Sequence, residues 1–139
     1  GRGGVMLTDE EREALVKYRI EKAYGTVIEA RDSADDNHWT LAANRLYYAV
    51  YYASKALLIQ NGIVAKSHEG VIGQIGEKFV LTGVISKDEA KLLARLQNMR
   101  KTGDYDDFIE WHQEEVEPLF PPVVAYIDKV KGLVDLKSE

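Results

Sequence analysis

The sequence contains no cysteine and only three histidines among its 139 residues. The absence of cysteine excludes a disulfide framework, a thiolate zinc site and a cysteine nucleophile, and it fits a reducing compartment. The histidines, at positions 38, 68 and 112, are too scattered to form the i, i+4 pair of a helical metal site. We therefore expect neither a metal ion nor another cofactor.

Long hydrophobic runs are also absent. The longest, Leu46 to Ala53, falls far short of the roughly 20 residues needed to cross a bilayer. With no targeting segment recognised, we expect a soluble, cytoplasmic protein that does not contact membranes. The net charge of −5 is too small to indicate a disordered acidic tail or a chain that coats DNA.

Hydrophobic residues make up 45% of the chain, which is enough for one core and not for two domains. The first four residues, Gly-Arg-Gly-Gly, look like a flexible leader or a remnant of cloning. We therefore divide the chain into a leader, residues 1–7, and a single helical domain, residues 8–136.

Capping signals and apolar periodicity predict helices throughout this domain. Thr8 and Glu11 form a capping box, and a polar break at 33–37 separates the first helix from the second. No alternating pattern bounded by hairpin turns indicates strands. The sequence predicts an all-α fold, a four- to five-helix up-and-down bundle. The expected helices are 9–32, a second from the break to Gln60 with Gly62 following it, 67–80, 86–101 ended by Gly103, and 122–134.

The second of these helices is apolar on nearly every side. Alanine, leucine, valine, isoleucine and tyrosine side chains leave almost no side of it for water, which is typical of the central helix of a bundle. Arg45 falls on the same side as Ala49 and Tyr52. An inward guanidinium needs a partner, so Arg45 is either half of an ion pair with an acid on another helix or an anchor for an anionic ligand.

Positive charge is concentrated in the middle of the chain. Residues 38–103 contain nine Lys or Arg and four acids, so this segment carries +5 and the rest of the chain −10. The asymmetry suggests that the middle helices bind an anion such as a nucleotide or RNA phosphate, although surface solvation alone produces comparable fluctuations.

Arg100 lies on the expected inner stripe of the fourth helix, between Leu93 and Leu96. It can satisfy the last carbonyls of that helix, or it can form a phosphate-binding corner with the Asp104 and Tyr105 that follow. His68 is expected at the start of the third helix, where the helix dipole favours its neutral form. A solvated surface position is the alternative for His68.

Three blocks, considered together, resemble a nucleotidyltransferase-associated prokaryotic branch of the HEPN domain family. They are NRLYYAVYYA at 44–53, KSHEG at 66–70 and RKTGDYDDF at 100–108. The likeness extends from about Thr8 to Val134. It implies an all-α bundle, often a homodimer, and frequently a small nucleotidyltransferase as the partner protein.

Many HEPN proteins are metal-independent ribonucleases with an Arg-x(4–6)-His motif at the dimer interface. The resemblance places Arg100 at the arginine of this motif, whereas Tyr105 stands where the histidine is expected. We consider three functions: a nucleotide- or RNA-binding module of a toxin–antitoxin-like pair, a metal-independent ribonuclease, and a purely structural or interaction bundle. The candidate catalytic residues are Arg100, Tyr105 and His68, and the candidate ligand-binding residues are Arg45, Tyr48, Tyr52 and Asp104.

Overall fold

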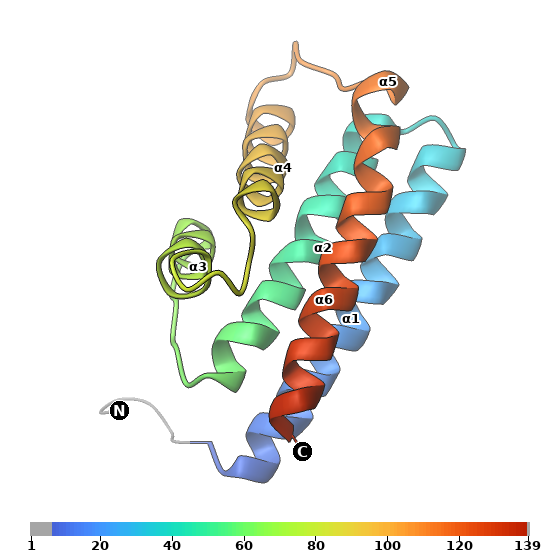
Figure 1. Cartoon of the computed structure of the whole chain (residues 1–139). Coiled ribbons are helices and arrows are strands. Elements are labelled where there is room, and N and C mark those ends of the chain that lie inside the picture. Colours follow the sequence, from blue (N-terminus) through green and yellow to red (C-terminus); the bar gives the residue numbers. More distant parts are fainter. Residues whose placement is uncertain (1–6, 139) are drawn as a thin grey trace.

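The computed structural model describes residues 7–138, which form a bundle of helices joined by short connections (Figure 1). This described part contains no strand, so the all-α prediction is confirmed. Residues 1–6 of the expected leader lie outside it. The elements are α1 (Asp9–Asp35), α2 (Trp39–Gln60), α3 (His68–Ile75), a π-helical turn (Gly76–Val80), α4 (Lys87–Tyr105), α5 (Gln113–Val116), a 3-10 turn (Glu117–Leu119) and α6 (Phe120–Ser138).

Helix α1 begins as the sequence predicts and ends three residues later than expected. The Thr8 hydroxyl accepts a hydrogen bond from the Glu11 amide, and the Glu11 carboxylate accepts one from the Thr8 amide. The predicted break at 33–37 starts too early because Ala34 is buried and continues the apolar stripe of α1. The chain then reverses direction at Asn37, whose φ of 62° places it in the left-handed region.

Helix α2 is the centre of the bundle, as its apolar sequence predicts. It contacts α1 and α6 on one side and α3 and α4 on the other (Figure 1). Gly62 follows its C-cap Asn61 with a φ of 72°, which a residue with a side chain rarely adopts. Buried alanines allow the neighbouring helices to approach closely: Ala42, Ala43, Ala49, Ala53 and Ala56.

Helix α4 begins at a second capping box, formed by Ser86 and Glu89, as predicted. The prediction that Gly103 ends this helix is wrong, because α4 continues to Tyr105. Gly103 instead allows close packing: a Cβ built at this position would lie 3.0 Å from Cγ2 of Thr40 and 3.4 Å from Nε1 of Trp111. The extension matters because it makes Asp104 and Tyr105 helical residues with fixed directions.

Helix α6 starts at Phe120, before the expected Pro122. Pro121 and Pro122 fit within its first turn, where the backbone amides need no intrahelical acceptor. Within the described part of the chain, no helix is long and apolar enough to span a membrane.

Candidate functional site

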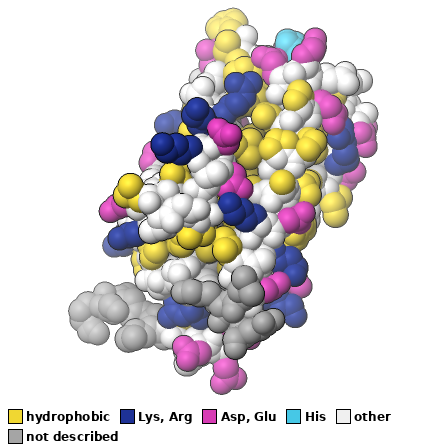
Figure 2. Space-filling view, viewed as in Figure 1, with side chains coloured by type: hydrophobic (Ala, Val, Ile, Leu, Met, Phe, Trp, Pro, Cys, Tyr) yellow, Lys and Arg dark blue, Asp and Glu magenta, His cyan; other side chains and the backbone are white. Residues whose placement is uncertain are grey.

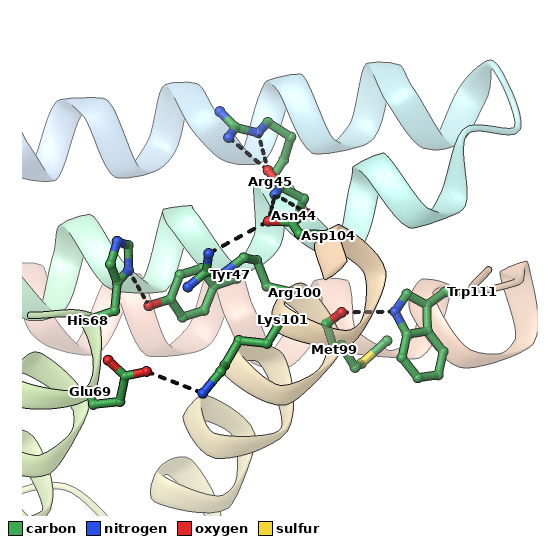
Figure 3. Close-up of polar contacts among 10 residues, drawn as sticks. All are labelled: Asn44, Arg45, Tyr47, His68, Glu69, Met99, Arg100, Lys101, Asp104 and Trp111. Carbon is green, nitrogen blue, oxygen red and sulfur yellow. Dashed lines mark hydrogen bonds and ion pairs between the residues drawn. The ribbon is translucent and has the colours of Figure 1, made fainter. Parts of the chain in front are cut away.

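An aromatic cluster lies where α2 faces α3. It consists of Tyr47, Tyr48 and Tyr51 of α2 and His68, the first residue of α3. The Tyr47 hydroxyl and His68 Nδ1 share a hydrogen bond of 2.8 Å (Figure 3). The His68 ring stacks on Tyr51, with centroids 4.5 Å apart and planes inclined by 17°. Residues three and four apart share a helix face, so α2 presents these tyrosines together.

Arg100 extends from α4 onto this cluster. Its side chain is 9% exposed, and its Cζ lies 5.1 Å from the ring centroid of Tyr47 and 5.8 Å from that of Tyr48. The contact with a carboxylate is long, 3.6 Å from Nη1 to Oδ2 of Asp104. Nε of Arg100 has no hydrogen-bond partner among the described residues. The buried cation is therefore stabilised mainly by the Tyr47 side chain and the neighbouring ring of Tyr48, and only weakly by an acid.

Asn44 connects the two candidate arginine sites. Its side-chain amide donates to Asp104 over 3.2 Å, and its carbonyl oxygen accepts from Nη2 of Arg45 over 2.8 Å (Figure 3). Arg45 also forms an ion pair of 3.3 Å with Glu29 of α1, and its side chain is 30% exposed. Of the two alternatives for Arg45, the ion pair with an acid on another helix is present, although it lies at the surface. An incoming anion would compete with Glu29 for the guanidinium.

The remaining aromatic candidate, Tyr52, lies on the α1 side of α2. Lys22 of α1 places its Nζ 5.2 Å from the Tyr52 ring centroid, and the rings of Tyr52 and Tyr48 are 6.1 Å apart. Tyr48 is thus shared between both arginines, with the Cζ of Arg45 5.0 Å from its centroid. Tyr52 belongs to the edge of the site.

Burial favours the uncharged forms of three members of the aromatic cluster, Tyr47, Tyr51 and His68. Burial raises the pKa of Tyr47 strongly, and burial also raises the pKa of Tyr51. Burial, followed by the positive charge of Arg100, lowers the pKa of His68 below its ordinary value of 6.5. His68 is therefore neutral at pH 7, which agrees with the charge state expected from its sequence position.

Tyr105 is exposed and is not packed on the aromatic cluster. It follows Arg100 by five residues on the same helix, which rotates it by about 140°, and it is 77% exposed. Asp104, rotated by only about 40°, meets Arg100. The structure thus brings Arg100 together with Tyr48, Asp104 and the Tyr47–His68 pair, and it does not bring Tyr105 onto the cluster.

Sequence reasoning missed Tyr47, Tyr51 and Asn44 as members of this site. The repeated tyrosines at helical spacing were a usable signal, but they are equally typical of a packed core. The other histidines occupy N-cap positions, His38 at α2 and His112 at α5. No group of three His, Cys, Asp or Glu among the described residues could hold a metal ion.

Basic side chains also gather on α4, the helix that carries Arg100. In the view of Figure 2, Lys and Arg side chains gather over α4. At the edge, Lys101 of α4 forms an ion pair of 3.2 Å with Glu69 of α3, directly after His68. This pair links the two helices that carry Arg100 and His68.

Comparison with known proteins agrees with this architecture. The sequence model of the HEPN domain matches residues 16–132. A relative from Thermotoga maritima, named "UPF0332 protein", is 31% identical over 128 residues, which cover 91% of this chain and 97% of the relative. Two relatives from Methanocaldococcus jannaschii, named "Putative toxin MJ0142" and "Putative toxin MJ0605", are each 30% identical. The alignment with MJ0142 covers 86% of this chain and 81% of that relative. The alignment with MJ0605 covers 88% of this chain and 87% of that relative. The chain therefore belongs to the HEPN domain family.

Proposed function

We propose that this protein is a toxin-like HEPN module that binds RNA or nucleotide phosphate at Arg100, next to the aromatic cluster. The observation that carries the proposal is the state of Arg100: buried, weakly paired and with an unsatisfied Nε. A guanidinium presents a rigid fork of donors that matches phosphate oxygens, and a phosphate would supply the acceptors that Arg100 lacks.

The surroundings of Arg100 support the same ligand class. The half-buried rings of Tyr48, Tyr51 and His68 offer flat faces on which unpaired bases can stack, as in many single-stranded RNA sites. Arg45 also contacts the Tyr48 ring and adds a second cation. Among the residues described here, the carboxylates that contact these two arginines are Asp104 and Glu29, at 3.6 and 3.3 Å.

The partner in this proposal is a small nucleotidyltransferase, and the relatives named as toxins support a toxin–antitoxin-like pair. The proposal also includes a homodimer. Phe108 is 95% exposed and Ile109 37% exposed, directly after α4 and beside the exposed Tyr105. Large apolar side chains in one exposed segment are typical of a protein contact. Light scattering of wild type and Phe108→Ser at equal concentration tests this: a dimer in both variants would exclude Phe108 from the interface.

A metal-independent ribonuclease is the second candidate, because neutral His68 is oriented by Tyr47 and lies within the field of Arg100. The ribose 2′-hydroxyl would attack the adjacent phosphorus while His68 accepts its proton. Arg100 would stabilise the charged phosphorane. The bond to the 5′-oxygen then breaks, leaving a 2′,3′-cyclic phosphate, and the 5′-oxygen takes the proton from His68 and becomes a hydroxyl. Tyr105 could supply this proton instead only if its exposed side chain turned toward the site.

The test is incubation of the pure protein with labelled single-stranded RNA in excess EDTA, with binding and cleavage measured together. We compare wild type, Arg100→Gln and the matched control Arg95→Gln, which removes the same charge from an exposed position on α4. Arg100→Gln should weaken RNA binding by about tenfold or more, since a charged hydrogen bond contributes about 1.5–3 kcal/mol. The control should change it by less than about twofold.

Each result has a definite meaning. Cleavage by wild type that is lost in Arg100→Gln and in His68→Asn establishes the ribonuclease. Binding without cleavage, lost in Arg100→Gln, establishes the binding module. Equal affinity in all variants would contradict the site and favour the purely structural or interaction bundle.

A further inference from the structure

A second basic site lies at the opposite end of α2, outside the Arg100 site. There, α1, the end of α2 and the following loop enclose a cavity of about 370 Å3. Arg12 and Arg19 of α1 and Lys55 of α2 line it, together with an apolar wall that includes Ile59, Ile63 and Val71. We call this cavity the Arg19 pocket. None of the described residues that line it is Asp or Glu.

Among the described side chains, no carboxylate neutralises its three cations. Arg12 donates from Nη1 to the backbone carbonyl of Ile59 over 2.8 Å. Lys55 places its Nζ 5.2 Å from the ring centroid of Tyr51. Among the described residues, no carboxylate forms an ion pair with Arg12, Arg19 or Lys55.

Burial makes this arrangement costly without a ligand. Arg19 and Lys55 are both half-buried. Burial lowers the pKa of each, and the charge of Arg19 lowers the pKa of Lys55 further. Surface lysines and arginines usually extend into water, whereas these converge on one concave space. Convergent like charges without a counter-ion are typical of a site that binds an anion.

We propose that the Arg19 pocket binds a phosphate group, held by Arg19 and Lys55 with Arg12 at its edge. Three positive charges are balanced better by a phosphate-ester dianion than by a single carboxylate, which would leave two of them uncompensated. The cavity is large enough for more than the phosphate alone, and its apolar wall suits the flat, apolar part of a nucleotide. The phosphate can belong to a free mononucleotide or to the terminal monoester of an RNA strand, since an internal phosphodiester carries only one negative charge.

Tyr51 is the connection between this pocket and the aromatic cluster. Its ring interacts with Lys55 and also stacks on His68. One RNA strand bound at Arg100 could therefore continue into the Arg19 pocket. Mononucleotide binding in the pocket does not depend on the RNA role proposed for Arg100, because the pocket has its own cations.

The experiment measures binding of AMP, of adenosine and of a short labelled single-stranded RNA to the full chain. The variants are Arg19→Gln and Lys55→Gln, with Arg95→Gln and Lys91→Gln as controls that remove the same charges from exposed positions on α4. Adenosine is the matched ligand control, since it lacks only the phosphate. Circular dichroism melting confirms that each variant is folded, and the two pocket variants serve as independent replicates.

We expect each pocket variant to weaken phosphate-dependent binding by about tenfold and the controls to change it by less than about twofold. If the pocket variants weaken the binding of AMP and not that of adenosine, the pocket is a mononucleotide site. If they weaken only the binding of RNA, the pocket holds a phosphate of the RNA strand. The proposal is overturned if wild type binds neither AMP nor RNA, or if the pocket variants match the controls with both ligands.

The same series includes Arg100→Gln, which separates this proposal from the previous one. If Arg100→Gln weakens RNA binding and the pocket variants weaken nothing, the pocket proposal fails while the Arg100 site stands. If the pocket variants weaken AMP binding and Arg100→Gln leaves RNA binding unchanged, the pocket proposal stands and the Arg100 site fails.

Discussion

The two sides of α2 each bury a tyrosine hydroxyl, and they use it differently. Toward α6, the hydroxyls of Tyr126 and Ser54 share a hydrogen bond of 2.7 Å, and both residues are fully buried. Toward α3, the hydroxyl of the fully buried Tyr47 shares a hydrogen bond with His68, which is only half-buried. The Tyr47 ring also contacts the guanidinium of Arg100.

The difference separates a structural contact from a functional one. Burial raises the pKa of both tyrosines strongly, so both phenols stay neutral. The hydrogen-bond partner of Tyr126 is the hydroxyl of Ser54, which is neutral and fully buried. A bound ligand would therefore not alter this contact. Around Tyr47 the partners are an ionisable imidazole and an under-paired guanidinium, both of which respond to a bound phosphate.

The largest expected effect comes from removing each hydroxyl in turn. Tyr126→Phe should lower the free energy of unfolding by about 1–3 kcal/mol, because the buried Ser54 hydroxyl loses its partner. Tyr47→Phe should cost less, since water can replace the phenol at His68. Urea unfolding followed by circular dichroism measures both. RNA affinity should change in Tyr47→Phe alone, and an equal change in Tyr126→Phe would contradict the distinction between the two sides.

Two helical glycines sharpen the comparison at a smaller scale. A Cβ built at the exposed Gly25 of α1 meets nothing within 4 Å. Gly25→Ala should therefore raise the free energy of unfolding by about 0.5–1 kcal/mol through helix propensity. Gly103→Ala on α4 should not raise the free energy of unfolding in this way, because the new Cβ would lie 3.0 Å from Cγ2 of Thr40. Thermal melting of both variants measures this difference in stability. Equal stabilisation would show that Thr40 moves aside freely.

Asp104 gives a smaller effect, in the direction of tighter binding. Its carboxylate competes with a phosphate for Arg100, whereas the amide of Asp104→Asn keeps the shape and removes the charge. We expect RNA affinity to rise by roughly threefold, which is under 1 kcal/mol. Fluorescence anisotropy measures it, with the exposed Asp107→Asn as the control. Weaker binding in Asp104→Asn alone would mean that Asp104 positions Arg100.

The smallest expected effect is a pH dependence from His68. The lowered pKa means that the folded protein favours the neutral imidazole. Its contribution to stability is thus complete above the ordinary pKa of 6.5 and is lost as pH falls from there through the folded-state pKa. His68→Asn should remove this part of the acid sensitivity between about pH 7.5 and pH 5. An NMR titration midpoint above 6.5 would contradict the assignment.

Much of the fold was predictable because local signals decide it. Thr8, Ser67 and Ser86 cap helices where the sequence places them, and the apolar α2 occupies the centre. The start of α6 was placed two residues too late, and the other errors were at Gly103 and at the 33–37 break. There, packing against Trp111 and burial of Ala34 override the usual preference of glycine and polar residues for helix ends.

The candidate site was predictable only in part. Arg100 is identifiable from its position on an apolar stripe and from the HEPN-like block that contains it. The extension of α4 past Gly103 could not be read from the sequence, and it turns Tyr105 outward while bringing Asp104 onto Arg100. The short spacing between Arg100 and Tyr105 in the sequence therefore does not predict which side chain contacts Arg100 in the structure.

The sequence by itself determined the helical class, the order of the helices, the family and the concentration of positive charge in the middle of the chain, because these depend on local residue patterns. Only the tertiary structure decided that His68 bonds Tyr47, that Arg100 is buried with an unsatisfied Nε, and that Arg19 and Lys55 share one cavity. Those contacts join separate helices, and their geometry depends on how the helices pack and rotate against one another.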